Sequence, residues 1–245
     1  MHRPQPRGAH MAPSIVFDFD GTLAIGHGPV RAYAACVAEA APVGSDFVAR
    51  VDAELARYDS GESAYRDGYD IVGSLGEAAG ASADALRTAY ARSRARLGTD
   101  LAVVHTIDGL DAALEALGRS ARLVLATNAP ETGVDAVLDA WGVRARFDEL
   151  HFTVGKPAGL EPLIDRLIAD GPVLAIGDIY AFDLAPAAAR GADTALVGAT
   201  AAASPAPVTM RGRSLADLVP GIQTWAATAA SSTSAPLGAG SGIER

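Results

Sequence analysis

Short apolar runs alternate with helix-length amphipathic segments over the second half of the chain. Residues 122–126, 173–176 and 194–197 are rich in Val, Leu, Ile and Ala, which is typical of buried parallel strands, and a further strand is expected near Leu150. Helices are expected between these strands, up to Leu117 and over residues 132–141, 158–168 and 182–190. Strands that alternate with helices predict βαβ units, and therefore a Rossmann-like α/β core with a parallel sheet and helices on both faces.

The segment after the first expected strand has a different periodicity. That strand covers residues 14–19 and ends at a Gly-Thr turn. From about residue 29 to 97, apolar residues recur at helical spacing, as at Phe47, Val51 and Leu55. The pattern therefore predicts an inserted all-helical cap directly after the first strand. Because ligands of open α/β sheets bind at the carboxyl ends of the strands, we expect this cap to cover the ligand site.

These patterns divide the chain into an α/β core, a cap and two terminal segments. We expect residues 13–24 and 105–226 to form the core and residues 25–104 to form the helical cap. Residues 1–12 contain Pro, Gly and Arg without periodicity, and residues 227–245 are mostly Ser, Ala, Gly and Thr. We interpret these terminal segments as a disordered leader and a flexible tail.

Composition and charge narrow the classes of protein that fit. Apolar residues make up 49% of the chain and charged residues 20%, which favours a globular protein over a disordered or fibrous one. The net charge of −9 disfavours a nucleic-acid partner. No apolar run approaches the ~20 residues that span a bilayer, so no membrane partner is expected. The single cysteine, Cys36, cannot form an internal disulfide, and without a secretory signal we expect a cytoplasmic protein.

Polar side chains follow the expected core strands at the point where each strand ends. Asp18 and Asp20 end the first strand, and residues two apart in extended backbone share a face, so both carboxylates are expected to point into one crevice. Two adjacent carboxylates are costly unless a cation or a shared proton offsets their charge, and Mg²⁺, which prefers oxygen ligands, is the favoured cation. Thr127 and Asn128 end the next core strand, where a hydroxyl and backbone N–H groups can bind an anion.

One lysine and two further aspartates follow the same pattern. The chain has 19 arginines but a single lysine, Lys156, in a Gly-Lys-Pro sequence before an expected helix. Lysine carries a compact point charge, so a site that requires it would not accept the planar guanidinium of arginine. Asp178 follows the strand at 173–176, and Asp183 comes five positions later. We therefore expect these strand exits to bring carboxylates, a hydroxyl and an ammonium group to one edge of the sheet.

These segments resemble the four motifs of the haloacid dehalogenase-like (HAD) hydrolase superfamily. The matching sequences, in the family's order, are DFDGT at residues 18–22, LATN at 125–128, GKP at 155–157, and GD at 177–178 followed by Asp183. The helical insertion between the first two motifs resembles the family's C1-type cap. The resemblance implies a phosphatase that acts on a small phosphorylated metabolite with Mg²⁺ as cofactor, and it leaves the oligomeric state open.

The resemblance also implies a role for each motif residue. Asp18 would attack phosphorus and form an aspartyl-phosphate, while Asp20 would protonate the leaving oxygen and then activate water. Relatives that break carbon–halogen bonds lack the second aspartate because their leaving group needs no proton, so Asp20 favours phosphate esters. The metal ligands would be Asp18, the Asp20 carbonyl, Asp178 and, through water or in an outer shell, Asp183. The phosphoryl group would be bound by Gly21, Asn128, and the catalytic pair Thr127 and Lys156.

Two other functions share parts of this residue set. A phosphosugar mutase on the same fold also uses the Asp18 and Asp20 pair, and it passes the phosphoryl group to a second sugar hydroxyl instead of to water. A signalling receiver domain likewise combines Asp, Thr and Lys as a phosphoacceptor, but it is much shorter and has no large insertion after the first strand. The phosphatase is therefore the leading hypothesis, and a need for a bisphosphate activator would distinguish the mutase.

The cap contains residues that fit a role in specificity, and for each of them a packing or solvated role is the simpler interpretation. The cationic and aromatic candidates near its expected rim are Arg31, Tyr58, Tyr65, Arg66 and Tyr69. Arg92 and Arg96 share a helix face because they are four residues apart, which also fits a charged outer surface. His105 and His151 lie near strand ends and are expected to be structural.

Overall fold

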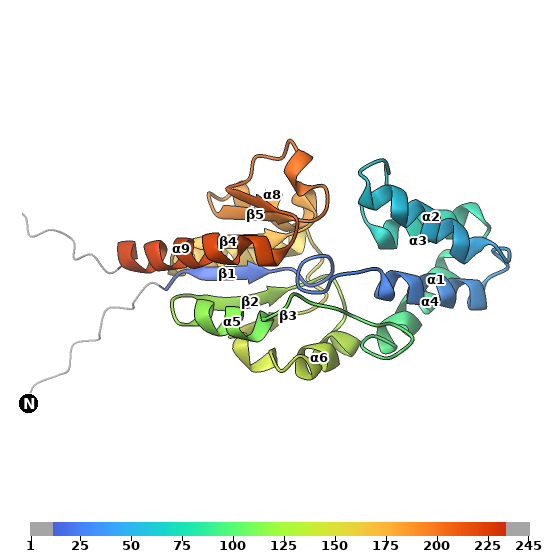
Figure 1. Ribbon diagram of the computed structural model, residues 1–245, viewed down its shortest axis with the longest axis horizontal. Coiled ribbons are helices and arrows are strands. Elements are labelled where there is room, and N and C mark those ends of the chain that lie inside the picture. The colour runs from blue at the N-terminus through green and yellow to red at the C-terminus, as the bar shows by residue number, and fades with distance from the viewer. Residues whose placement is uncertain (1–11, 234–245) are drawn as a thin grey trace, which may run out of the picture.

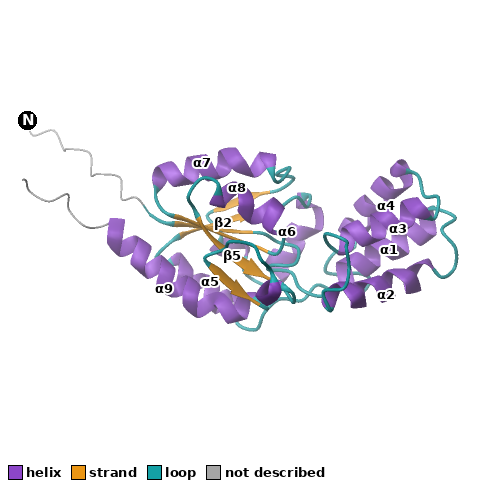
Figure 2. Ribbon diagram, turned by 90° about the horizontal axis from the view of Figure 1, so that it is seen from above, coloured by secondary structure: helices purple, strands orange, loops and turns teal. Residues whose placement is uncertain are grey.

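The computed structural model describes residues 12–233 and contains one sheet of six parallel strands in the order β3-β2-β1-β4-β5-β6. The strands are β1 (Ser14–Phe17), β2 (Arg122–Ala126), β3 (Glu149–His151), β4 (Val173–Gly177), β5 (Asp193–Val197) and β6 (Met210–Gly212). Helices cover both faces of the sheet, and the inserted helices form a separate group beyond the carboxyl end of β1 (Figures 1 and 2). The architecture is the α/β fold with an inserted helical cap that the sequence pattern predicts.

β1 lies near the middle of the sheet because consecutive apolar residues allow it to be covered on both sides. Ser14 is in register with Arg122 of β2 on one side and with Val173 of β4 on the other. Its neighbour Ile15 belongs to the hydrophobic cluster on one face of the sheet, whereas Val16 belongs to the cluster on the opposite face. Since side chains alternate between the faces of a strand, a central strand needs apolar residues in succession.

The core helices bury their apolar stripes against the two faces of the sheet. On one face lie α5 (Leu110–Gly118), α6 (Glu131–Ala140) and α9 (Leu215–Thr233). On the other lie α7 (Glu161–Asp170) and α8 (Ala185–Ala188). Short helical turns complete the core: η1 (Arg144–Arg146), η2 (Ala158–Leu160), η3 (Tyr180–Leu184) and η4 (Ala201–Ala203).

The cap has an apolar core of its own. Its helices are α1 (Gly28–Ala40), α2 (Phe47–Asp59), α3 (Gly68–Ala78) and α4 (Ala83–Ala95). Phe47, Val51 and Leu55, which recur at helical spacing, are all buried inside it. The two linkers between cap and core run side by side, because the Ile25 amide donates to the His105 carbonyl at 2.8 Å. Cap and core therefore meet where β1 ends.

The C-terminal part of the structure differs from the sequence-based expectation. The hydrophobic pattern predicts neither β6 nor α9, and α9 continues through residues 227–233, where we expected a flexible tail. Leu215, Leu218 and Ile222 follow helical spacing and pack onto the sheet, although Pro220 lies within the helix. The alanine-rich and serine-rich composition of this segment hides the periodicity, because small residues occupy many of its positions.

Residues 1–11 of the expected leader and residues 234–245 of the expected tail lie outside the described residues. β1 ends at Phe17 instead of at Phe19, so Asp18 and Asp20 both follow the strand. Within residues 12–233, no helix combines the length and the apolar character needed to cross a bilayer.

Candidate active site

Asp18 and Asp20 follow β1 at the carboxyl edge of the sheet. The Asp18 amide donates to the carbonyl of Ile176 in β4 at 2.9 Å, which continues the strand pairing by one residue. The chain then turns, since the Ala24 amide donates to the Phe19 carbonyl at 2.8 Å. Asp20 therefore lies in a turn and not in the extended backbone that we predicted. Both carboxylates nevertheless line the same cavity.

The ammonium group of Lys156 lies between two carboxylates. Its Nζ is 2.6 Å from Asp18 Oδ1 and 2.7 Å from Asp183 Oδ1, and all three side chains are buried. The Lys156 amide donates to Asn128 Oδ1 at 2.7 Å, so the asparagine fixes the backbone that carries the ammonium group. The other oxygen of Asp183 accepts from the Ile179 amide at 3.0 Å. Lys156 is therefore held through its ammonium group and its backbone amide, and Asp183 is held through both of its carboxylate oxygens.

Three carboxylates gather beside this lysine. One oxygen from each of Asp18, Asp178 and Asp183 lies within 4.8 Å of the others. When all three are ionised, their charge exceeds that of one ammonium group, and a hard divalent cation would offset the excess. The donor set therefore fits Mg²⁺. The carboxylate of Asp20 is not part of this cluster.

Loss of solvent changes the proton affinity of these groups. Burial raises the pKa of Asp18 to about 7, against the opposing attraction of Lys156. Burial also raises the pKa of Asp178 well above its usual value, and the charge of Asp183 adds to the shift. For Lys156 burial favours the neutral amine, but Asp18 and Asp183 outweigh it and raise the pKa of the ammonium group. The lysine is therefore charged, whereas burial disfavours the ionised forms of Asp18 and Asp178.

Two glycines let the backbone approach the carboxylate cluster. Gly21 has a φ of +83°, and a Cβ there would lie 2.2 Å from Asp178 Oδ2. A Cβ at Gly177 would lie 2.3 Å from the Cβ of Asp183. Any side chain at either position would displace a carboxylate, and at Gly21 it would also strain the backbone.

A cavity of about 490 Å³ lies between the carboxyl edge of the sheet and the cap. Thr127 is buried at its wall, and Thr127 Oγ1 accepts from the Ala129 amide at 3.0 Å, which leaves the hydroxyl proton for an anion. The predicted site residues that line the cavity are Asp18, Asp20, Gly21, Thr127, Asn128, Asp178 and Asp183. Lys156 joins them through its ion pair with Asp18. The structure thus brings all the predicted core residues of the site together.

The sequence profile of the haloacid dehalogenase-like hydrolases matches residues 13–191. The chain belongs to this family. The match begins before β1 and ends after α8, so it includes every residue of the carboxylate and lysine cluster and the whole helical insertion. A search among curated proteins finds no match.

Solved structures from several bacteria share the fold. The candidate HAD hydrolase YfnB from Bacillus subtilis, solved with bound magnesium, is 18% identical with a TM-score of 0.60, over 86% of this chain and 98% of that one. A candidate haloacid dehalogenase-like hydrolase from Bacteroides fragilis is 21% identical with a TM-score of 0.60, over 84% and 98%. A candidate phosphoglycolate phosphatase from Lactobacillus plantarum is 18% identical with a TM-score of 0.57, over 85% and 98%. At these identities the likeness shows the fold alone.

Some of the predicted cap candidates of this HAD hydrolase line the cavity. These are Tyr58, Arg66 and Tyr69. Arg66 also connects cap and core, because its Cζ lies 4.9 Å from the ring centroid of Phe182 in η3. Arg31 and Tyr65 do not line the cavity, and Arg31 instead pairs with Asp52 at 2.6 Å on the surface.

Several cap residues at the site were not predicted from the sequence, among them Tyr90, which lines the cavity, and one residue that contacts Asp20. Arg92 in α4 and Arg96, which follows that helix, form ion pairs with Glu39 of α1 at the surface of the cap, as the alternative interpretation of their spacing expects. Arg94, between them, is only 1% exposed and lies 3.1 Å from Asp20. The helical period could have indicated its burial. Arg94 is eight residues, or about two turns, after the buried Leu86, so both lie on the same side of α4.

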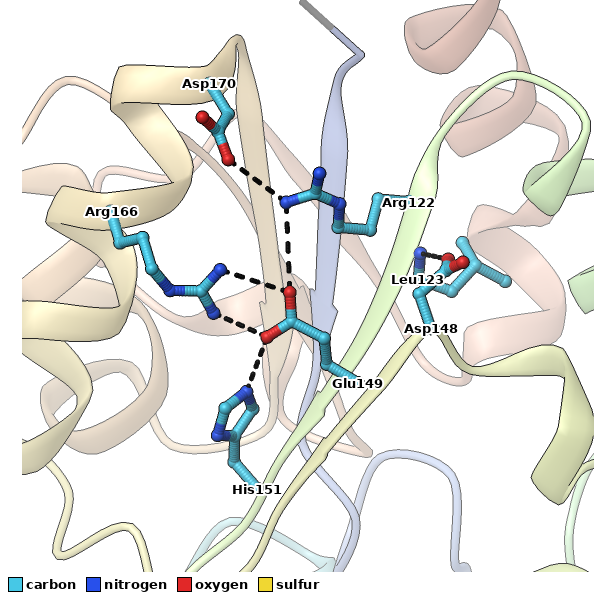
Figure 3. Close-up of polar contacts among 7 residues, drawn as sticks. All are labelled: Arg122, Leu123, Asp148, Glu149, His151, Arg166 and Asp170. Carbon is cyan, nitrogen blue, oxygen red and sulfur yellow. Dashed lines mark hydrogen bonds and ion pairs between the residues drawn. The ribbon is translucent and has the colours of Figure 1, made fainter.

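A second polar network of the HAD fold lies on the edge strand β3. Glu149 accepts from Arg166 Nη1 at 3.1 Å and lies 2.8 Å from His151 Nε2 (Figure 3). Arg122 lies 3.8 Å from Glu149 and also pairs with Asp170 at 3.1 Å. None of these five residues lines the cavity. The contacts of His151 therefore fit the structural role expected for it.

Proposed function

We propose that this HAD hydrolase is a Mg²⁺-dependent phosphatase that cleaves a small phosphate monoester through an aspartyl-phosphate on Asp18. The observation that carries the proposal is the second carboxylate, Asp20, which lines the cavity with Asp18 and has one oxygen bound by the cap. An alcohol leaves poorly without a proton, whereas a halide needs none. A second acid at this position therefore favours phosphate esters over carbon–halogen substrates.

The two aspartates act in both halves of the proposed reaction. In the first, a carboxylate oxygen of Asp18 bonds to phosphorus while the ester P–O bond breaks, and its electron pair leaves with the alcohol oxygen. Asp20 donates a proton to that oxygen. In the second, water attacks the same phosphorus, Asp20 takes a proton from the water, and Asp18 leaves as a carboxylate. Inorganic phosphate is released, and both aspartates return to their starting states.

The neighbouring side chains bind the phosphoryl group and keep it in place. Lys156 and Thr127 offer an ammonium group and a hydroxyl to its oxygens, which carry most of the charge during transfer. Asn128 orients Lys156 through the hydrogen bond to its amide. Gly21 leaves the space that a side chain would fill beside Asp178.

The carboxylate cluster supplies the proposed metal site. Asp18, Asp178 and the backbone carbonyl of Asp20 would hold Mg²⁺, and Asp183, whose oxygens are bound by Lys156 and a backbone amide, would act through water or by orienting the lysine. Bound Mg²⁺ would neutralise the clustered carboxylates and the phosphoryl oxygens.

A substrate panel tests the proposal. The protein would be assayed with Mg²⁺ against phosphorylated metabolites, para-nitrophenyl phosphate and 2-chloro carboxylic acids, with Asp18→Asn as the inactive control. Phosphate release by the wild type and its loss in the variant would support the proposal. Chloride release without phosphate release would contradict it. Conversion of a sugar phosphate to its isomer only with a bisphosphate activator would indicate a mutase instead.

A further inference from the structure

A buried arginine of the cap contacts the carboxylate of Asp20. Arg94 lies at the C-terminal end of α4, and its side chain is 1% exposed. Its Nη1 donates to Asp20 Oδ1 at 3.1 Å and to the Tyr69 hydroxyl at 2.6 Å, and that hydroxyl donates to the same Oδ1 at 3.1 Å. Two donors from different cap helices thus converge on one oxygen of a core carboxylate.

The guanidinium has donors that the fold leaves unused. Arg94 Nε and Nη2 are buried and have no hydrogen-bond partner among residues 12–233. The rings of Tyr69 and Tyr90 lie beside it, with their centroids 5.9 and 6.0 Å from Cζ. A buried arginine with unsatisfied donors stabilises a fold less than an apolar side chain of similar size. Its contact with Asp20 is therefore better explained by a role for that carboxylate.

The backbone of Arg94 packs tightly on the core. A Cβ at Gly133, in the kink of α6, would lie 2.2 Å from the Arg94 carbonyl oxygen, and Gly133 has a φ of +86°. Leu97, one turn further along, belongs to the hydrophobic cluster of the sheet. This packing fixes the backbone of Arg94 relative to the core. Tyr69 adds a second hydrogen bond to Asp20 from α3.

The two oxygens of Asp20 have different surroundings. Oδ1 accepts the hydrogen bonds of Arg94 and Tyr69. Oδ2 has no hydrogen-bond partner among the described residues, and the Asp20 side chain is 25% exposed at the cavity wall. A carboxylate that is held through one oxygen presents the other in a defined direction. Oδ2 is therefore the oxygen available to exchange a proton in the cavity.

We propose that Arg94 is a positioning residue which, together with Tyr69, holds Oδ1 of Asp20 so that Oδ2 faces the leaving oxygen and then the attacking water. The inference rests on the proposed function, in which Asp20 transfers that proton. Without Arg94 the Asp20 side chain gains access to other staggered positions, and proton transfer loses its fixed geometry. Arg94 itself touches neither the substrate nor the reacting atoms.

Kinetics with two leaving groups test this role. In Arg94→Met, kcat/KM for an alkyl phosphate should fall about 10²-fold, because general acid catalysis contributes at least that much. For 2,4-dinitrophenyl phosphate, whose leaving group departs as an anion, kcat/KM should fall less than about threefold. The same substrate should show a burst of dinitrophenolate, since hydrolysis of the phosphoenzyme also needs Asp20. Arg92→Met, a change on the outer surface of the same helix, is the matched control and should alter none of these.

A double variant distinguishes positioning from a general structural effect. If Arg94 acts through Asp20, adding Arg94→Met to Asp20→Asn should cause no further loss of kcat/KM for the alkyl phosphate. An additive loss in the double variant would overturn the inference. So would an equal loss on both substrates in Arg94→Met alone, or no loss at all.

Two further observations keep the test decisive. If circular dichroism shows that Arg94→Met is unfolded, Tyr69→Phe replaces it. That variant removes one of the two donors, so kcat/KM should fall several-fold for the alkyl phosphate only. An equal loss of kcat/KM on both esters would refute the inference.

Wild-type activity separates the two proposals. Failure of the wild type to hydrolyse either ester refutes the proposed function, whereas wild-type hydrolysis with Arg94→Met at wild-type rates refutes the role of Arg94 alone.

Discussion

The Nζ of Lys156 lies 2.6 Å from Asp18 Oδ1, although 138 positions separate the two residues in the chain. The contact exists because parallel strands end at one edge of the sheet, where Asp18 follows β1 and Lys156 follows β3. The lysine side chain is 3% exposed and has a second carboxylate oxygen, from Asp183, at 2.7 Å. A compact ammonium group fits between two such oxygens, and a planar guanidinium does not. This gives a physical reason for the single lysine in an arginine-rich chain.

Lys156→Arg is expected to lower kcat for para-nitrophenyl phosphate by about 10²-fold or more, even though the charge is preserved. The larger, planar group would displace Asp18 or Asp183 from its buried position. Steady-state kinetics would measure the loss, with circular dichroism to check the fold. Arg166→Lys, the reverse exchange on the surface, should leave kcat unchanged. Near-normal turnover of Lys156→Arg would show that the site does not require an ammonium group.

Mg²⁺ is expected to raise the melting temperature, and a chelator is expected to abolish activity. A ligand that binds only the folded state stabilises it by about 2.7 kcal/mol at one hundred times its dissociation constant. Asp178→Asn should reduce the Mg²⁺-induced shift, because it removes one carboxylate of the cluster. Asp170→Asn, which changes an aspartate paired with Arg122, should keep the shift. A wild-type melting temperature that does not respond to Mg²⁺ would argue against the metal site.

Gly21→Ala is expected to cost more stability than Gly142→Ala. Both glycines have positive φ, +83° and +71°, so alanine at either position should cost about 1–2 kcal/mol of backbone strain. A Cβ at Gly142 meets nothing within 4 Å, whereas at Gly21 it meets Asp178. Gly21→Ala should therefore unfold at a lower temperature and lose the Mg²⁺ response as well. Thermal unfolding with and without Mg²⁺ would show this, and equal behaviour of the two variants would contradict it.

The stabilising effect of Glu149 is expected to disappear in acid. The hydrogen bond from Arg166 lowers the pKa of Glu149 from 4.5 to about 2, and His151 adds to the shift. A lowered pKa in the folded state means that the stabilisation is complete above about pH 5 and is lost as the pH falls toward 2. Because the side chain is 26% exposed and screened, we expect about 1 kcal/mol.

Chemical denaturation of Glu149→Gln and the wild type at several pH values measures this effect. The difference in the free energy of unfolding should be about 1 kcal/mol at pH 7 and close to zero at pH 2. A difference that stays constant over this range would mean that the carboxylate charge does not cause the stabilisation.

Much of the site could be predicted because its core residues follow apolar strands. Asp18, Thr127 and Asp178 each come directly after a strand of the parallel sheet, and the strand order brings such positions to one edge. The prediction that Asp20 lies in extended backbone was wrong, because that residue lies in a turn, and the cap holds its carboxylate. Its partner Arg94 depends on how the cap sits on the core, which local periodicity does not describe.

The C-terminal helix could not be predicted for a different reason. Pro220 and the many small residues of α9 weaken the helical pattern, and the helix owes its stability to packing of Leu218 and Ile222 against the sheet. Trp225 adds a tertiary contact, because its Nε1 donates to Asp193 Oδ2 in β5 at 2.8 Å. Such contacts are formed between distant segments, so they leave little trace in the local sequence.

Covalent phosphorylation of Asp18 is the step on which the proposed function depends. Asp20→Asn should accumulate the aspartyl-phosphate when it reacts with 2,4-dinitrophenyl phosphate, because this leaving group needs no acid whereas the following hydrolysis needs a base. Borohydride reduction of the acid-quenched protein converts an acyl phosphate to an alcohol, and peptide mass spectrometry then locates it. We predict homoserine at position 18. Unmodified aspartate at position 18, despite release of dinitrophenolate, would contradict the covalent mechanism.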